Sequence, residues 1–194
     1  MTKEDNVNGL LVPAGETVSL GDFSAQCLAN STVCENFTVS FLFKINGSIA
    51  ENETVDVIHQ MPVSDAAHRV QFTMMQNSSH YTGVAVIARG DNRTEVTGAI
   101  SSMESWIHVA IIYTGPGYLE LFLNGTNGGS NASSVPYSGS VTEVNMTLGS
   151  SNSSSGFLVS YLQVIEGAIS NQADVDSLKD GSFAQGELNK SITF

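Results

Sequence analysis

The chain has 194 residues, 41% of them hydrophobic, which is the length of one domain with a sizeable buried core. Its formal net charge of −12 excludes nucleic acid and anionic membrane surfaces as partners, because both are bound through basic patches. No apolar run reaches the length that spans a bilayer, so we expect no direct membrane insertion by this segment.

Short apolar segments of β-strand character follow one another along the chain. Residues 1–9 are polar, and we expect an N-terminal tail there and one domain over residues 10–194. The clearest strand runs from residue 37 to 45, where Phe or Val occupies every second position and predicts one buried face. Further strands are predicted at 10–13, 17–20, 55–60, 69–75, 84–88, 94–100, 144–148 and 157–165, and loops at 46–54 and 124–143.

The strongest signal is a β-hairpin in the middle of the chain. Its first arm, 106–113, is largely apolar on both faces, which is typical of a strand inside a sandwich. The Thr-Gly-Pro-Gly sequence at 114–117 cannot continue a strand, so the chain turns there. In the second arm, 118–123, Leu occupies every second position, and an Asn-Gly dipeptide that tolerates the positive φ of a tight turn follows it.

One helix is predicted, near the C-terminus. Asn171 can cap its start, and Asp174 at the third helical position meets the positive end of the helix dipole. The helix continues to Leu178, and Gly181 can end it. About a dozen short strands with one short C-terminal helix predict an all-β, antiparallel two-sheet sandwich.

The sequence is crowded with glycosylation sequons. Of the 15 asparagines, 11 begin Asn-x-Ser/Thr, whereas 40 Ser and Thr residues placed at random would give roughly three. This excess favours an extracellular location, either secreted or in an ectodomain, with glycans on the surface; the alternative is that Ser- and Thr-rich loops create sequons by accident. The sites are Asn30, Asn36, Asn46, Asn52, Asn77, Asn92, Asn124, Asn131, Asn145, Asn152 and Asn189.

The two cysteines fit the same location. Cys27 and Cys34 are seven residues apart and can close a short loop as a disulfide. The alternative is two free thiols in a cytosolic protein. No spacing of His or Asp nearby makes them a zinc site.

Three blocks of the sequence carry a family pattern. The first, VSLGDFSAQCLANSTVCENFTVSFLFKI at 18–45, combines Leu-Gly-Asp, a small Cys loop and a Phe-rich strand. The second is WIHVAIIY with the YLELFLNG arm of the hairpin. The third, MTLGSSNSSSGFLVSYLQVIEGAISNQADVDSL at 146–178, has a Leu-Gly, a Gly-Phe strand and the closing helix. In this order the blocks resemble the laminin-G-like, concanavalin-A-like jelly-roll domain, which is related to pentraxins. Leu42 departs from the pattern, since a Trp is usual there.

The resemblance implies a jelly-roll sandwich and a function in binding. The version with Gly-Asp and a Cys loop resembles modules in the ectodomains of adhesion-type receptors and polycystin-like proteins. We therefore expect a non-catalytic extracellular recognition or adhesion module within a larger glycosylated protein, with an extracellular protein or glycan as its ligand. The alternative is a calcium-dependent glycan-binding lectin domain.

Calcium is the usual ion of this family, bound by Asp, Asn and carbonyl oxygens of rim loops. Asp22, Asp56, Asp65 and Asp91 lie in or near predicted loops. No cluster has the spacing of a dedicated site, so solvated loop acids are the alternative interpretation and no metal ligand is assigned.

No catalytic residues are predicted. A retaining glycosidase needs two carboxyls about 5 Å apart on one strand face within a sugar-binding cleft. The nearest candidates, Glu51 and Glu53, flank a sequon in a loop. Trp106, the only tryptophan, is interpreted as a core residue, and His108 in the Trp-x-His-Val-Ala strand as structural. His59, His68 and His80 fall at strand ends or in loops and do not form a triad with a serine and an acid.

Arg89-Gly90-Asp91 lies at a predicted hairpin tip, where an integrin could bind it through its opposed charges. The alternative is turn chemistry, since Gly-Asp-Asn favours a tight turn. A glycan on Asn92 would also cover the tripeptide.

Two stretches, 93–123 and 153–188, contain no sequon. We predict that a protein partner uses their exposed turns, 114–118 and 177–185. The alternative is that the gaps exist only because buried strands cannot accept glycans.

We predict that Cys27 and Cys34 are bonded in secreted material, which would stabilise the fold by about 2–3 kcal/mol for so short a loop. Peptide mapping without reduction should recover the two cysteines in one linked pair. Two free thiols would show that the prediction is wrong.

Overall fold

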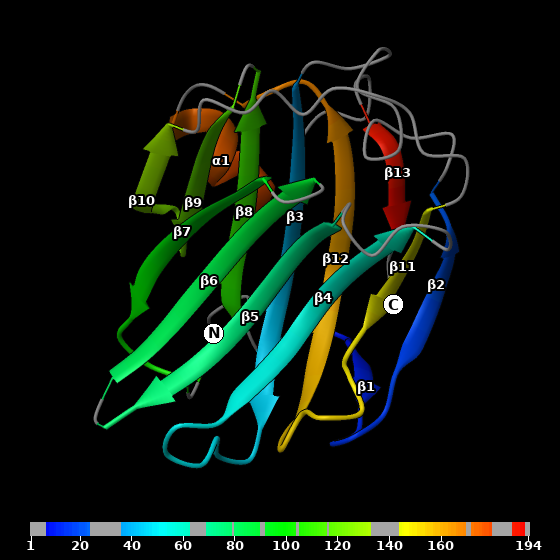
Figure 1. Ribbon diagram of the computed structural model, residues 1–194, viewed down its shortest axis with the longest axis vertical. Helices are drawn as coiled ribbons and strands as arrows, with labels where there is room; N and C mark the ends of the chain where they lie inside the picture. Colours follow the sequence, from blue (N-terminus) through cyan, green and yellow to red (C-terminus); the bar gives the residue numbers. More distant parts are fainter. Residues whose placement is uncertain are drawn as a thin grey trace.

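The structure is a computed structural model that describes residues 7–23, 36–62, 69–78, 80–89, 92–103, 105–115, 117–132, 144–169, 172–179 and 188–192. Within these ranges the chain forms strands and one helix, arranged as two stacked layers (Figure 1). The elements are β1 (Leu10–Val12), β2 (Val18–Asp22), β3 (Asn36–Asn46), β4 (Thr54–Pro62), β5 (Arg69–Asn77), β6 (His80–Arg89), β7 (Asn92–Ile100), β8 (Ile107–Thr114), β9 (Tyr118–Leu123), β10 (Thr126–Ala132), β11 (Val144–Leu148), β12 (Gly156–Glu166), α1 (Gln172–Lys179) and β13 (Leu188–Ile192).

The two layers are a seven-stranded and a six-stranded sheet. The seven-stranded sheet has the order β1-β12-β3-β8-β9-β10, with β13 also paired to β12; the six-stranded sheet has the order β2-β11-β4-β5-β6-β7. Neighbouring strands are antiparallel, and several pairs join distant parts of the chain, such as β12 with β3. These features confirm the predicted all-β, antiparallel jelly-roll sandwich with one short C-terminal helix.

Aromatic side chains from both sheets meet in the core. The alternation predicted around β3 is confirmed, because Phe37, Val39, Phe41 and Phe43 are fully buried. Phe72, from β5 in the other sheet, packs edge-on against Phe41 and Phe43, with ring centroids 5.5 Å and 5.7 Å away. Aromatic contacts of this geometry stabilise a core beyond the area that they bury.

The helix α1 covers part of the outer face of the seven-stranded sheet. Val175 and Leu178 of α1 are buried with Ala110 and Ile112 of β8 in a cluster separate from the main core. No described element packs in this way on the outer face of the six-stranded sheet, and Figure 1 shows that sheet in front, open to the viewer. Among the described residues, the two outer faces therefore differ in what covers them.

The two sheets close against each other at one edge, where β7 meets β10. Gly98 of β7 and Gly128 of β10 approach so closely that a Cβ on either would lie 3.2 Å from the other's Cα. Asn131 Nδ2 donates to the carbonyl of Glu95 across the same edge at 3.0 Å. Only glycine allows two backbones so near.

Some of the sequence-based boundaries are wrong. Residues 124–143 are not one long loop, because β10 occupies part of that range and pairs with β9. The strand at 156–166 is not the last, since β13 follows and pairs with it. Trp106, which we expected in the core, is only half-buried and lies outside the main core. Its indole ring lies against Gly9 of the N-terminal segment instead.

A test of the closed edge is the substitution Gly129→Ala. A Cβ at this position would lie 2.7 Å from the backbone oxygen of Thr97, so the strand must move away from β7. We expect the free energy of unfolding to fall by about 1–3 kcal/mol in urea titrations, as overpacking does elsewhere. Ser130→Ala, at the exposed neighbouring position, should have little effect. Equal stability of both variants would contradict the account of this edge.

Candidate functional site

Ser40 and His108 form a pair with the composition of a nucleophile and its base. Ser40 Oγ lies 2.9 Å from His108 Nε2, and each residue is 1% exposed. The other ring nitrogen, His108 Nδ1, is buried and makes no hydrogen bond within the described part of the chain, so the third member of a triad is missing. Because neither side chain reaches solvent, the pair cannot meet a substrate. The structural role of His108 stays a prediction.

The electrostatic surroundings of His108 keep it neutral. Its pKa is lowered from 6.5 to about 4, first because burial penalises the imidazolium and then because the Lys179 ammonium lies near; Asp176 acts in the opposite direction. Its backbone N–H donates to Asn124 Oδ1 at 2.9 Å, and the Asn124 N–H donates back to its carbonyl at 2.8 Å. His108 thus joins β8 to the turn after β9, beside α1.

The outer face of the six-stranded sheet has an apolar strip along β6. Val84, Val86 and Ala88, called the β6 strip below, are 3–6% exposed although they point away from the main core. The side chains that flank them in β5 and β7 are polar: by register Gln71 and Glu95 stand on either side of Val86. Because the strip itself is nearly buried, a ligand on this face would contact mainly the polar side chains at its borders, with the strip as the apolar floor beneath them.

Three polar side chains beside the β6 strip hold one another in place. Gln71 Nε2 donates to Asp56 Oδ1 at 3.0 Å, and Thr73 Oγ1 donates to the same oxygen at 2.9 Å. Gln71 Nε2 is also 3.0 Å from Thr73 Oγ1, and all three residues are half-buried. The backbone N–H of Asp56 donates to Ser153 Oγ at 3.2 Å. A group fixed in this way presents carboxylate, amide and hydroxyl oxygens at defined positions, which is what sugar hydroxyls and peptide amides require.

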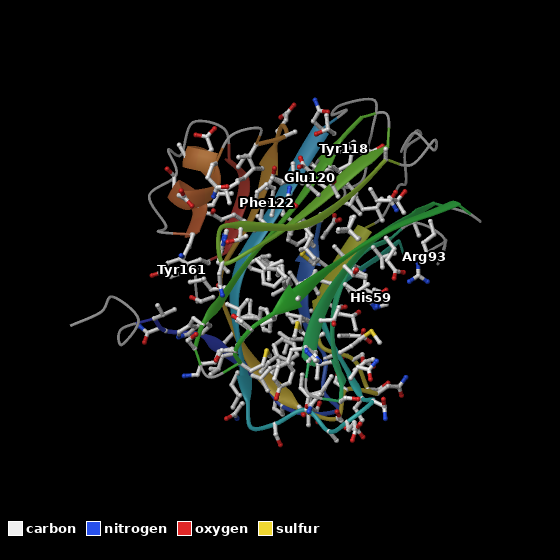
Figure 2. The ribbon with its side chains drawn as sticks, turned by 90° about the vertical axis from the view of Figure 1, so that its left-hand side faces the viewer. His59, Arg93, Tyr118, Glu120, Phe122 and Tyr161 are labelled. Carbon is white, nitrogen blue, oxygen red and sulfur yellow. The ribbon has the colours of Figure 1, made fainter. Side chains whose placement is uncertain are left out.

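Charged and titratable side chains border the same face. Arg93 pairs with Glu95 on β7; their side chains are 52% and 41% exposed. Figure 2 shows Arg93 and His59 on the side of the sandwich opposite α1, whereas Tyr118, Glu120 and Phe122 follow β9 in the other sheet. We define the candidate binding face as the β6 strip with Asp56, Gln71, Thr73, Arg93 and Glu95.

Of the four aspartates considered as calcium candidates, the structure describes two, and they lie on different strands. Asp22 ends β2 and Asp56 lies within β4, while Asp65 and Asp91 are outside the described residues. Within the described ranges, no three His, Cys, Asp or Glu side chains are grouped as metal ligands. Asp56 is held by Gln71 and Thr73 instead.

Several other predicted sites lie outside the described residues. Cys27, Cys34 and the sequon at Asn30 are among them, as is His68. Of the Arg89-Gly90-Asp91 tripeptide, only the backbone of Arg89 at the end of β6 is described. Glu51 and Glu53 are exposed in the β3–β4 loop.

Most sequon asparagines with described side chains are exposed. Asn36 is the half-buried one, and its Oδ1 accepts from the Gly115 N–H at 3.0 Å. Four exposed sites lie at one end of the sandwich, where the loops after β3, β5 and β11 meet: Asn46, Asn52, Asn77 and Asn152. Asn124, Asn131 and Asn145 are also exposed, and the side chains of Asn92 and Asn189 are not described.

Of the two sequon-free turns, the first is partly described and exposes an aromatic ring. Tyr118 at the start of β9 is 40% exposed, and Gly117 before it is buried with a φ of 98°. In the second turn, the helical residues Ser177 and Lys179 are described, and residues 180–185 are not. The part of these turns that a partner could reach includes Tyr118 (Figure 2).

Residues 18–172 match the sequence model of the Laminin_G_3 family, described as the concanavalin A-like lectin/glucanases superfamily. The match confirms the resemblance that the three sequence blocks indicate. No curated protein matches the chain. No described helix is long and apolar enough to cross a bilayer.

Solved structures with the same fold include toxin domains and a pentraxin. The receptor binding domain of botulinum neurotoxin C/D mosaic serotype is 13% identical, with a TM-score of 0.72 over 91% of this chain and 44% of that one. The binding domain of botulinum neurotoxin DC in complex with SialylT is 11% identical, with a TM-score of 0.63 over 91% and 47%. The native heptameric SAP-like pentraxin from Limulus polyphemus is 14% identical, with a TM-score of 0.62 over 83% and 80%.

These likenesses establish the fold alone. The chain spans less than half the length of the toxin chains and most of the pentraxin chain.

The buried neutral His108 predicts a pH dependence of stability. The unfolded chain takes up a proton near pH 6.5, whereas the folded chain resists it until about pH 4, so stability falls as the pH is lowered through this window. Between pH 7.5 and 5 this histidine should cost about 2 kcal/mol, measured by urea unfolding. In His108→Gln that part of the loss should disappear. A wild-type pH profile in His108→Gln would contradict the assignment.

Proposed function

The chain belongs to the concanavalin A-like lectin/glucanases superfamily, and from this membership we propose that it is a non-catalytic extracellular recognition module that binds a protein or glycan ligand. The proposal assigns ligand binding to the candidate binding face. It also takes the chain to be part of a larger glycosylated receptor or adhesion protein.

The observation that supports this function most directly is the fixed polar group beside the β6 strip. Binding sites combine an apolar lining with a few precisely placed polar groups. Here Val84 and Val86 supply the apolar part, and Asp56 accepts from Gln71 and Thr73 at 2.9–3.0 Å. Because these side chains are already ordered, binding costs little further rotamer entropy.

The extracellular location is supported by the sequons. At least seven of them have an exposed asparagine side chain, so an oligosaccharide could be attached without disturbing the core. A disulfide between Cys27 and Cys34 would be consistent with the same compartment.

A glycan is the ligand class that the polar group favours. Carboxylate, carboxamide and hydroxyl side chains in one cluster are complementary to the paired hydroxyls of a sugar ring. The toxin binding domain with the same fold was solved with SialylT, which supports the proposal by likeness of fold only. A calcium-dependent lectin is the second candidate, and a glycan array probed with and without calcium separates it from a calcium-independent module.

The binding face can be tested by removing single polar groups. Thr73→Val keeps the shape of the side chain but removes the hydroxyl that bonds Asp56, and Gln71→Ala removes the amide. Each should weaken binding of the fluorescent domain to glycan arrays or to cultured cells about tenfold, since one such hydrogen bond is worth about 1–1.5 kcal/mol.

Glu51→Gln, in the exposed β3–β4 loop, is the control and should bind as wild type. If Thr73→Val and Gln71→Ala keep the wild-type melting temperature and also bind as wild type, the ligand does not use this face.

A further inference from the structure

A cleft of about 530 Å³ opens at the end of the sandwich where four sequons lie. Its walls come from the end of β3 with the loop after it, from Tyr81 near the start of β6, and from residues 101–103 after β7. The volume is within the range of small-ligand pockets. Nothing in the proposed function uses this cleft, which is distinct from the candidate binding face.

The cleft walls combine an apolar surface with hydrogen-bonding groups. Tyr81 and Met103 are half-buried and pack against the main core, so they form a firm apolar wall. Ser48 and Ser101 are exposed and contribute hydroxyls, and Lys44 has no ion-pair partner within the described residues. Sugar rings present one apolar C–H face and a rim of hydroxyls, so an aromatic wall with hydroxyl and ammonium donors suits a carbohydrate.

The cleft begins at a sequon. Asn46, Gly47 and Ser48 form one Asn-x-Ser site, and Gly47 and Ser48 are themselves cleft residues. Asn46 and Lys44 are two residues apart on β3, so they lie on the same face of the strand about 7 Å apart. This face is turned away from the buried Phe43 and Ile45, and Asn46 ends the strand with its side chain exposed, so its glycan would pass over Gly47 and Ser48 to enter the cleft. The Ser48 carbonyl accepts from Ser155 Oγ at 2.7 Å, which fixes the loop beside the attachment point.

We propose that the occupant of this cleft is the first part of the N-linked glycan carried by Asn46 of the same chain. The apolar face of its N-acetylglucosamine residues packs on Tyr81 and Met103, and its hydroxyls bond the serines and Lys44. The proposal rests on the glycosylation that the proposed function includes.

Tethering makes this contact favourable even if the cleft binds free sugar weakly. A ligand attached through a short flexible linker has an effective concentration in the millimolar range. A cleft with millimolar affinity is then substantially occupied by its own glycan, while the same sugar free in solution would not bind at ordinary concentrations. A seated glycan would close the cleft to other ligands.

Enzymatic release of glycans from the folded protein tests the proposal. The domain is produced in secretory cells that make uniform oligomannose glycans, and glycopeptide mass spectrometry follows release by endoglycosidase H site by site. The Asn46 glycan should be released at least about tenfold more slowly than those at Asn52 and Asn152, which are exposed at the same end. After denaturation the three rates should become equal.

A variant in which a large side chain fills the cleft distinguishes protection by the cleft from protection by the local backbone. Ser101→Trp places a large side chain in the cleft from an exposed position, and Ala50→Trp places the same side chain in the exposed loop outside it. Ser101→Trp should raise the Asn46 release rate to that of Asn52, and Ala50→Trp should leave it slow.

Three outcomes would overturn the proposal. One is release at Asn46 as fast as at Asn52 in the wild type. Another is slow release that persists in Ser101→Trp, which would assign the protection to the local backbone. The last is an Asn46 that carries no glycan in the mass spectra, a result that does not affect the role proposed for the candidate binding face.

Discussion

The packing of Phe41 and Phe43 against Phe72 joins the two sheets, and the outward placement of the polar side chains on β5 depends on it. In a strand, neighbouring residues point to opposite faces, so burying Phe72 of β5 directs Gln71 and Thr73 outward on the six-stranded sheet. If β5 slipped by one residue against its neighbours, its apolar side chains would point to solvent and its polar side chains into the core. The free-energy cost of that exchange keeps the register fixed.

The outer faces of the two sheets are occupied in different ways. On the seven-stranded sheet, α1 buries Ala110 and Ile112, and beside it His108 stays neutral and bonded to Ser40. On the six-stranded sheet, no described element packs on β6, and Asp56 is held by hydrogen bonds from Gln71 and Thr73. One face therefore serves the stability of the fold, and the other is the face to which we assign the proposed ligand.

The sequence predicts those parts of the fold whose signal is local. The Phe-rich strand β3 and the hairpin of β8 and β9 follow from alternation and from the Thr-Gly-Pro-Gly turn between the two arms of the hairpin. Strand β10 was missed although the Asn-Gly turn, with positive φ at both residues, leads into it, because its sequence TNGGSNA has no apolar alternation. It pairs with β9 across that turn, and its glycines let it lie close to β7, a contact between distant parts of the chain.

The candidate site could not be predicted from the sequence, because its residues come together only in the folded sheet. Asp56 and Gln71 are 15 residues apart, and only the antiparallel register of β4 and β5 brings them within hydrogen-bonding distance. In the sequence, Asp56 resembles a loop acid and a calcium candidate, and Gln71 has no signal at all. The disulfide, the Arg-Gly-Asp tripeptide and the occupied sequons remain predictions.

The most direct measurement of the central claim is to block the candidate binding face with a glycan. Thr97→Asn combined with Ala99→Thr creates a sequon at two exposed positions of β7, and Thr97 stands opposite Val84 of the β6 strip. Thr97→Asn alone is the control, since it carries the same substitution without the sequon. With the glycan confirmed by mass spectrometry and the melting temperature unchanged, the account predicts that binding to glycan arrays or cells is lost in the double variant and kept in the control. Equal binding by both, or no binding by the wild-type chain, would contradict it.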